Sequence, residues 1–311
     1  MKKFRCLVIP SPSFSKHPVL VKETEQLAEK IILNSEGKRF DEAELLKFLS
    51  QNNADAAIIG TDPLTAAVVE KLTHLKAIGK YGVGKDNVDV AALKSKGIHF
   101  GWEGGVNKRS VSELSLGFML GHQRNIFRSI NRMQYGEWTK NGGFQLSEKT
   151  VGIVGFGHIG TDLAALLKPF SCKIVIHDIL DKSRECTQHQ AHQVTYDELL
   201  KTADIISFHV PGGPTTKNMF SQKEISKSKP STLVINTARG SIINFDDVTR
   251  AVNSHQLGGY ASDVFPVEPL NSTEFTVERG FYFTPHIGGN ADEAILNMGR
   301  AAIRGLMEYQ G

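Results

Sequence analysis

The sequence predicts an α/β protein with two doubly wound domains, each formed by a parallel sheet that helices cover. Short apolar runs typical of strands alternate with helical patterns before residue 100 and again after residue 150. The length of 311 residues exceeds the usual size of a domain with a single hydrophobic core. A turn-rich segment at residues 101–105 separates the two series and indicates a crossing between domains.

The first series alternates strands and helices of ordinary length. Asp41 is expected to begin a helix, because Glu44 three residues later completes a capping box. Apolar residues at helical spacing predict another helix over residues 19–31. The remaining expected elements are strands at 4–9, 56–59 and 75–79 and a helix over 64–72.

The second series follows a long helix, expected from about residue 110 to 132, and a polar loop through residue 143. A last helix is expected to be capped by Asn290, with Glu293 completing the capping box. The expected strands are 151–155, 173–177, 204–209, 232–236, 259–262 and 281–284.

Composition restricts the class of function. The 36 basic and 33 acidic residues give a formal net charge of +3, which does not indicate a nucleic-acid partner. Three widely spaced cysteines form neither a disulfide framework nor a metal-ligand pattern. No apolar stretch approaches the length of a membrane span or a signal peptide. We therefore expect a cytoplasmic protein with a small-molecule substrate and no bound metal, nucleic acid or membrane.

The best-defined motif is the glycine-rich turn at residues 155–160, which follows an apolar strand and opens a helix. Gly155 permits the tight turn, Gly157 lets a pyrophosphate approach the backbone, and Gly160 lets helix and strand pack closely. The alternative, a glycine-punctuated turn without a ligand, is disfavoured by this strand–helix context. The turn predicts a dinucleotide site, with cofactor-binding residues Gly155, Gly157, His158, Ile159 and Gly160.

Asp178 ends the next expected strand, close to the spacing of about 20 residues that dinucleotide sites favour. Its carboxylate can accept hydrogen bonds from the adenosine ribose and would repel a 2′-phosphate. Ile179 and Leu180 offer no arginine for such a phosphate, although Lys182 and Arg184 leave NADP open. The sequence therefore favours NAD over NADP.

Three consecutive strand ends carry residues with chemistry: Arg239, Glu268 and His286 follow the strands 232–236, 259–262 and 281–284. Ligands bind outside the carboxyl ends of strands in an open parallel sheet, so these side chains are expected beside the nicotinamide. Any one of them alone is most often a surface charge or a satisfied polar group. Their placement at consecutive strand ends favours a catalytic set.

These segments resemble the signatures of the D-isomer-specific 2-hydroxyacid dehydrogenases, and the resemblance covers nearly the whole chain. Residues 80–89 resemble the family's carboxylate-binding loop, and residues 107–113 resemble the start of its interdomain helix. His209-Val210-Pro211, followed by Thr215 and Thr216, resembles the loop beside the nicotinamide. We expect a Rossmann-type cofactor domain, residues 101–289, inserted in a flavodoxin-like substrate domain, residues 1–100 and 290–311.

The resemblance implies roles for the candidate residues. His286 would be the general acid–base, Glu268 would hold its imidazole, and Arg239 would bind the substrate carboxylate and polarise the carbonyl. The implied substrate-binding residues are Val83, Gly84, Arg239 and His286. The further cofactor-binding residues are His209, Val210, Pro211, Thr216, Thr237, Ala238, Arg239, Asp263, His286, Gly288 and Gly289.

The predicted function is hydride transfer between NAD(H) and C2 of a D-2-hydroxy acid or 2-oxo acid, with 3-phosphoglycerate or a related small hydroxy acid as substrate. The alternative is a dinucleotide-sensing binding protein on the same scaffold, which the Arg–Glu–His set disfavours. The helix from residue 110 and the loop through 143 resemble the family's dimerisation arm and predict a homodimer. Trp102 departs from the family pattern, and two interpretations stay open: a wall of the substrate pocket or a packed hinge residue.

Overall fold

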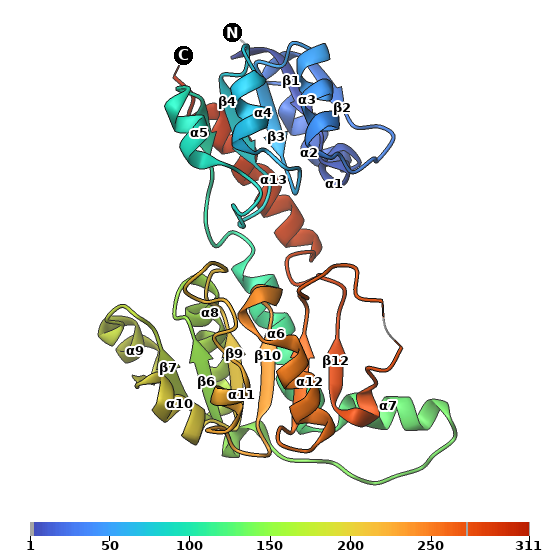
Figure 1. Ribbon diagram of the computed structural model, residues 1–311, viewed down its shortest axis with the longest axis vertical. Coiled ribbons are helices and arrows are strands. Elements are labelled where there is room, and N and C mark those ends of the chain that lie inside the picture. Colours follow the sequence, from blue (N-terminus) through green and yellow to red (C-terminus); the bar gives the residue numbers. More distant parts are fainter. Residues whose placement is uncertain (1–2, 272, 311) are drawn as a thin grey trace. The chain divides into compact units, whose positions relative to one another are not determined.

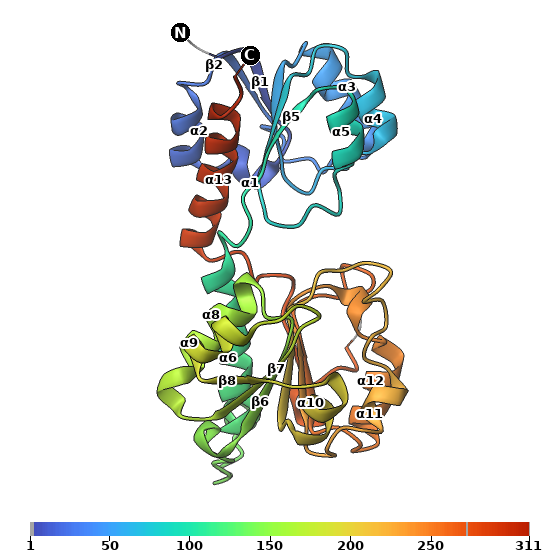
Figure 2. The ribbon, with the colours of Figure 1, turned by 90° about the vertical axis from the view of Figure 1, so that its left-hand side faces the viewer.

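The computed structural model describes residues 3–271 and 273–310 and confirms the predicted fold class (Figures 1 and 2). The chain forms two compact units: unit 1 comprises Met1–Asn107 and Ala291–Gly311, and unit 2 comprises Lys108–Asn290. The first crossing lies seven residues beyond the expected position, because the segment after residue 101 is bonded to unit 1: Trp102 bonds to Val83, and Glu103 pairs with Arg304.

Unit 1 is built on a five-stranded parallel sheet with the order β2-β1-β3-β4-β5. Its strands are β1 (Phe4–Ile9), β2 (Ala28–Leu33), β3 (Ala56–Ile59), β4 (Ala77–Lys80) and β5 (His99–Gly101). Its helices are α1 (Pro12–Ser15), α2 (Pro18–Thr24), α3 (Glu42–Gln51), α4 (Ala66–Lys71), α5 (Val90–Ser95) and α13 (Asp292–Met307). Figure 2 shows α2 and α13 on one face of the sheet and α3, α4 and α5 on the other, so each face has its own apolar core.

The helix expected over residues 19–31 is wrong beyond Thr24, where α2 ends. Ala28–Leu33 is instead strand β2, which pairs in parallel with β1 along its whole length. The β-branched pair Ile31-Ile32 suits a strand. Pairing with β1 outweighs a helical spacing that a short apolar segment can show in either conformation.

The last helix of unit 1, α13, packs closely on the sheet through glycines. A Cβ added to Gly101 would lie 2.3 Å from the Cα of Gly305, so the backbones of β5 and α13 are in contact. Only residues without a side chain permit this approach. The helix begins at Asp292 with Ala291 as its N-cap, so the expected capping by Asn290 is wrong.

Unit 2 is built on a seven-stranded parallel sheet with the order β12-β11-β10-β9-β6-β7-β8. Its strands are β6 (Thr150–Val154), β7 (Lys173–His177), β8 (Ala191–Gln193), β9 (Ile205–Phe208), β10 (Leu233–Asn236), β11 (Gly259–Ser262) and β12 (Phe281–Phe283). Its helices are α6 (Lys108–Gln123), α7 (Ile126–Gln134), α8 (His158–Leu167), α9 (Ser183–His189), α10 (Tyr196–Thr202), α11 (Gln222–Ile225) and α12 (Phe245–Asn253). Short 3₁₀ turns are η1 (Leu146–Glu148), η2 (Lys168–Phe170), η3 (Gly240–Ile242) and η4 (Val277–Arg279). Figure 2 shows α6, α8 and α9 on one face of this sheet and α10, α11 and α12 on the other.

The long helix expected from about residue 110 to 132 is divided into α6 and α7. Asn125, between them, adopts a left-handed conformation with a φ of 52°, which ends the first helix and redirects the chain. α7 buries none of its residues in this chain. Ile126, Ile130 and Met133 are 42%, 54% and 52% exposed, and their spacing places them on one helix face.

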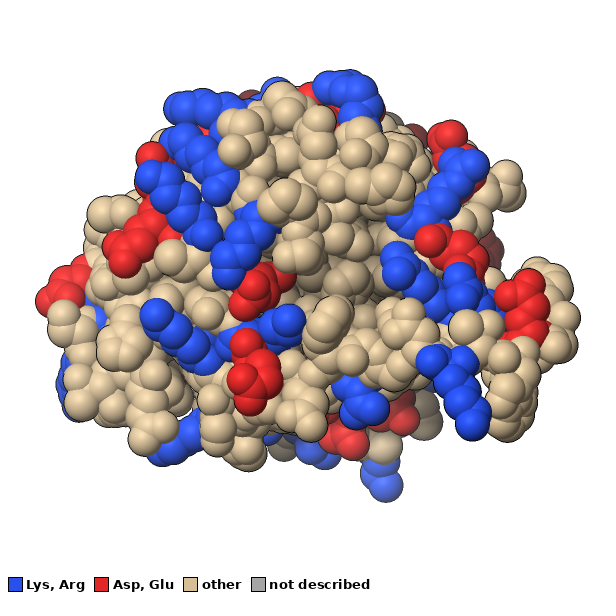
Figure 3. All heavy atoms as spheres, turned by 90° about the horizontal axis from the view of Figure 1, so that it is seen from below, with Lys and Arg blue, Asp and Glu red and all other residues tan. Residues whose placement is uncertain are grey.

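Within the described range, no helix is long and apolar enough to cross a membrane. Among the same residues, no group of three His, Cys, Asp or Glu side chains could hold a metal ion. On the face that Figure 3 shows, Lys and Arg side chains are interspersed with Asp and Glu. This face therefore presents no extended region of like charge.

Candidate functional site

The glycine-rich turn connects β6 to α8. Gly155 has a φ of +92°, a conformation that other residues rarely adopt, and a Cβ there would lie 2.8 Å from the backbone carbonyl carbon of His209. A Cβ on Gly160 would lie 2.2 Å from the carbonyl oxygen of Gly155. At Gly157, the N-cap of α8, an added Cβ would meet no described atom within 4 Å. The backbone is therefore closely packed at Gly155 and Gly160. It is open at Gly157, where a phosphate would meet the N-terminus of α8.

Asp178 lies just beyond β7 and anchors this turn. Its Oδ2 accepts a hydrogen bond from the N–H of Phe156 at 2.7 Å, and its Oδ1 accepts one from the N–H of Leu180 at 3.0 Å. Each carboxylate oxygen can accept a further hydrogen bond, so ribose hydroxyls can still bind. His158 and Ile159, which complete the predicted set, form the first turn of α8.

The loop after β9 lies against the glycine-rich turn at His209. The Nε2 of His209 lies 2.8 Å from the Oγ of Ser207, and its Nδ1 is buried without a partner among the residues that the structure describes. Burial lowers the pKa of His209 to about 3, so its ring is neutral near pH 7. The Oγ1 of Thr216 donates to the carbonyl oxygen of Pro211 at 2.7 Å, which closes the loop that follows Val210.

Glu268 and His286 come from different strand ends and form a hydrogen-bonded pair. The Nδ1 of His286 lies 2.7 Å from the Oε2 of Glu268, and the Oε1 of Glu268 accepts from the N–H of Phe265 at 3.0 Å. The backbone thus holds one carboxylate oxygen and the imidazole holds the other. With Nδ1 as the donor in this bond, Nε2 is left to exchange a proton with a ligand.

Asp263 fixes the histidine loop, residues 284–288, which carries His286. Its buried Oδ1 accepts hydrogen bonds from the Oγ1 of Thr284 at 2.6 Å and from the N–H of Ile287 at 2.7 Å. Its Oδ2 accepts from the N–H of Gly288 at 2.7 Å, and a Cβ on that glycine would lie only 2.9 Å from this oxygen. His286 has a φ of 56°, which is uncommon for a residue with a side chain, so the loop depends on being held from outside.

Arg239 follows β10, the strand next to β11. Its Nη1 donates to the carbonyl oxygen of Ala238 at 2.7 Å, and its own carbonyl oxygen accepts from the Nδ2 of Asn236 at 2.9 Å. The Oγ1 of Thr237 lies 3.0 Å from the Oγ of Ser115 on α6. These contacts fix the turn that presents the guanidinium at the carboxyl edge of the sheet.

In unit 1, Val83 and Gly84 lie in the loop after β4, and both are half-buried. Neither of their N–H groups donates a hydrogen bond to another described residue. Lys80 is buried at the end of β4, and its Nζ donates to the carbonyl oxygen of Gly60 at 2.6 Å. Burial raises the pKa of the nearby Asp62 carboxyl, while the Gly60 N–H and Lys80 act in the opposite direction. The amide donors without a described partner, together with the buried Lys80, make this loop suited to an anion.

Two polar residues lie in the segment that the sequence analysis compared with the start of the interdomain helix, but neither was predicted for the site. The Oγ of Ser110 donates to the carbonyl oxygen of Gly288 at 2.6 Å, which ties α6 to the histidine loop. The Oδ1 of Asn107, directly before α6, is buried and has no partner within the described part of the chain. Polar residues at a helix start are ordinary, and no local pattern distinguished these two.

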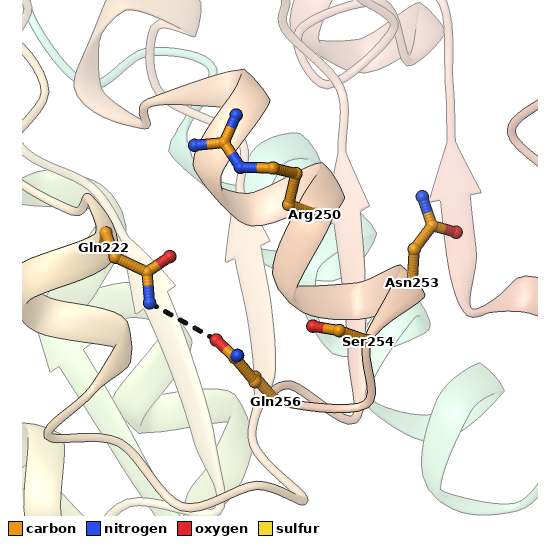
Figure 4. Close-up of a pocket in the computed structure, with 5 residues that line it drawn as sticks. All are labelled: Gln222, Arg250, Asn253, Ser254 and Gln256. Atoms are coloured by element: carbon orange, nitrogen blue, oxygen red, sulfur yellow. Dashed lines mark hydrogen bonds between the residues drawn. The ribbon is translucent and has the colours of Figure 1, made fainter.

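A surface depression in unit 2 lies away from these strand ends (Figure 4). Its lining comes from α11, α12 and the turn after α12, where the N–H of Gly258 donates to the carbonyl oxygen of Thr232, just before β10 begins. The depression is therefore at the amino edge of the sheet. Its lining residues are Gln222, Arg250, Asn253, Ser254 and Gln256, none of them predicted for the site.

The parallel sheet, the glycine-rich turn and the Asp178 carboxylate define unit 2 as a dinucleotide-binding domain. Residues 116–288 match the family model described as D-isomer specific 2-hydroxyacid dehydrogenase, NAD binding domain. The chain belongs to this family, and the expectation of NAD as the cofactor is confirmed.

Individual relatives agree with this assignment. D-3-phosphoglycerate dehydrogenase of Escherichia coli (strain K12) is 36% identical over 271 residues, which cover 84% of this chain and 66% of that protein. The match thus spans slightly less than two thirds of that relative. Hydroxypyruvate reductase of Thermotoga maritima is 31% identical over 300 residues, 94% of this chain and 96% of that protein. A solved structure from Polaromonas sp. JS6 66, described as a D-isomer specific 2-hydroxyacid dehydrogenase, has a TM-score of 0.85 at 26% identity and covers 97% of this chain and 95% of that chain.

We expect NADH to support turnover roughly tenfold better than NADPH, because the Asp178 carboxylate would repel a 2′-phosphate. The ratio of kcat/KM values for the two nucleotides measures this preference. Asp178→Ser should narrow the ratio, whereas Asp197→Ser, which removes an exposed carboxylate from α10, should leave it unchanged. Equal or reversed wild-type values would contradict the assignment of Asp178.

Proposed function

We propose that the protein is an NAD-dependent dehydrogenase that transfers a hydride between NAD(H) and C2 of a D-2-hydroxy acid or its 2-oxo acid. The observation that carries the proposal is the 2.7 Å pair of His286 and Glu268 at the carboxyl edge of an NAD-binding sheet. Interconversion of a carbonyl and a hydroxyl requires a proton carrier at that edge. Similar proteins are named D-3-phosphoglycerate dehydrogenase, hydroxypyruvate reductase and glyoxylate reductase.

The described residues of unit 2 fit a dinucleotide. The open backbone at Gly157 and the N-terminus of α8 suit the pyrophosphate, and Asp178 suits the ribose. NAD(H), when bound, supplies or accepts the hydride. The loops after β9, β10 and β12 leave the same edge of the sheet. This supports the assignment to the cofactor of His209, Val210, Pro211, Thr216, Thr237, Ala238, Asp263, Gly288 and Gly289.

His286 is the proton carrier in this proposal. In reduction its protonated ring donates from Nε2 to the carbonyl oxygen, and in oxidation the neutral ring accepts the proton from the hydroxyl. Glu268 keeps the tautomer with a proton on Nδ1 and stabilises the imidazolium by its charge. The hydrogen bond from Phe265 to the other Glu268 oxygen prevents the carboxylate from turning away.

The substrate carboxylate has two sets of donors in this proposal. Arg239 carries a planar, permanently charged guanidinium whose forked donors suit a carboxylate and can polarise a neighbouring carbonyl. The N–H groups of Val83 and Gly84, which donate to no described residue, are the second set, and this supports unit 1 as the substrate-binding domain. The 36% identity to D-3-phosphoglycerate dehydrogenase supports 3-phosphoglycerate or a related small hydroxy acid as substrate.

A dinucleotide-sensing binding protein on the same scaffold is the second candidate. Such a protein requires the glycine-rich turn but no proton carrier, so the His286–Glu268 pair favours the enzyme. NADH oxidation measured with glyoxylate, hydroxypyruvate, phosphohydroxypyruvate and branched 2-oxo acids separates the two. The enzyme must reduce at least one of them. NADH binding without turnover of any 2-oxo acid would favour the sensor.

The kinetics of Glu268→Gln test the proton-carrier assignment. The amide keeps the shape of the side chain but removes the charge that stabilises the imidazolium. The ring carries its second proton at the start of reduction and at the end of oxidation, so the rate should fall by roughly tenfold in both directions.

The measurement is kcat/KM in both directions with the cofactor saturating. Glu198→Gln, on the exposed side of α10, is the matched control and should reproduce the wild-type values. Wild-type values of kcat/KM in Glu268→Gln would remove Glu268 from this role.

We also propose that the protein is a homodimer joined through α7. The support is the apolar stripe of Ile126, Ile130 and Met133 on a helix that buries no residue within its own chain. A second copy of the same face would remove this stripe from water. A cytoplasmic location and the lack of a nucleic-acid partner stay predictions from the sequence.

Sedimentation measured at micromolar concentration tests the dimer. The wild type should sediment as a dimer, and Ile130→Glu should shift it to a monomer because a charge replaces the centre of the stripe. Gln188→Glu adds the same charge on the exposed surface of α9 and should stay dimeric. A monomeric wild type, or a dimeric Ile130→Glu variant, would contradict an interface at α7.

A further inference from the structure

Trp102 follows β5 in unit 1 and contacts the anion-suited loop through two different groups. Its indole Nε1–H donates to the carbonyl oxygen of Val83 at 3.0 Å. The Nζ of Lys85 lies 4.0 Å from the centroid of its ring, a cation–π distance. The ring is therefore held on one edge by the loop backbone and on one face by the loop's own lysine.

The bond to Val83 fixes the orientation of a whole peptide plane. Among the described residues the one cis peptide bond is Glu268-Pro269, so the Val83–Gly84 peptide is trans. In a planar trans peptide the C=O and the N–H point in opposite directions. Because the carbonyl oxygen of Val83 is directed at the Trp102 indole, the N–H of Gly84 is directed away from it.

This loop requires such a constraint, since glycines flank Val83 on both sides. Gly82 has a φ of +122°, and glycine adopts many conformations with little difference in energy. A peptide between flexible residues can rotate and exchange the directions of its C=O and N–H. The Nζ of Lys80 also lies near this loop, 3.5 Å from where a Cβ of Gly82 would be. Without Trp102, no described side chain would hold the carbonyl of Val83.

We propose that Trp102 is a positioning residue that locks the Val83–Gly84 peptide with the Gly84 N–H presented to the substrate carboxylate. The inference rests on the proposed function, in which this N–H binds a 2-oxo acid. The role of Lys85 is secondary, because it keeps the indole in place and touches the ring, not the Val83 carbonyl. Trp102 then acts on the group common to all 2-oxo acids and does not select among their side chains.

Trp102→Phe tests the hydrogen bond, because it keeps an aromatic ring for Lys85 and removes the N–H. The KM for every accepted 2-oxo acid should rise roughly three- to tenfold, which corresponds to the free energy of one hydrogen bond. The kcat and the Kd for NADH should stay within about twofold of the wild type. Lys85→Met is the matched control: it removes the cation but leaves the indole N–H, so its KM should rise by less than that of Trp102→Phe. Thermal unfolding curves of both variants confirm that they are folded.

An unchanged KM in Trp102→Phe, or a changed ranking among 2-oxo acids, would overturn the proposal. So would a Lys85→Met variant whose KM rises as much as that of Trp102→Phe. If no 2-oxo acid is turned over by the wild type, the proposed function fails, but the contact of Trp102 with the loop can still be tested. The chain has two tryptophans, Trp102 and Trp138. In a Trp138→Phe protein saturated with NAD⁺, oxamate should change the Trp102 emission, and an emission that stays unchanged while calorimetry shows that oxamate binds would overturn the role of Trp102 by itself.

Discussion

The buried carboxylate of Asp263 is the interaction on which the geometry of the site depends. It accepts three short hydrogen bonds, all from the histidine loop at residues 284–288. Burial of a carboxylate without such donors would cost on the order of several kcal/mol, so the loop and the aspartate stabilise each other. The loop in return carries His286 in a left-handed conformation that the backbone alone does not favour.

The parallel sheet explains why these residues meet. Strands β10, β11 and β12 are adjacent, and Asn236 pairs with Ser262, which pairs with Phe283. The residues that follow these three positions therefore leave the sheet side by side at its carboxyl edge. Asp263 is the first residue beyond β11 and reaches across to the loop after β12. The glycine-rich turn after β6 leaves from the same edge, which supports a proton carrier beside a bound dinucleotide.

The sequence could predict the parts of the site whose chemistry lies in a local pattern. The glycine-rich turn, Asp178 and the three strand ends belong to this group, because each follows a short apolar strand. The hydrogen bonds of Asp263 could not be predicted, since an aspartate at a strand end looks the same whether it binds a ligand or a loop. The hydrogen bond from Trp102 to Val83 joins residues that follow two different strands, and no periodic pattern in the sequence indicates it. Strand β2 was missed because its short apolar run also fits a helix.

Single-turnover reduction by Asp263→Asn, with NADH already bound, tests this account most directly. The amide replaces one acceptor oxygen by an NH₂ group, so at least one loop donor loses its partner, at a cost of about 1–3 kcal/mol. The account predicts that reduction of the 2-oxo acid slows by roughly ten- to hundredfold, because His286 leaves its position. Because Asp263 is also assigned to the cofactor pocket, the Kd for NADH should rise, but by a smaller factor than the rate of reduction falls. A variant that reduces the 2-oxo acid at the wild-type rate, or that loses only NADH affinity, would contradict it.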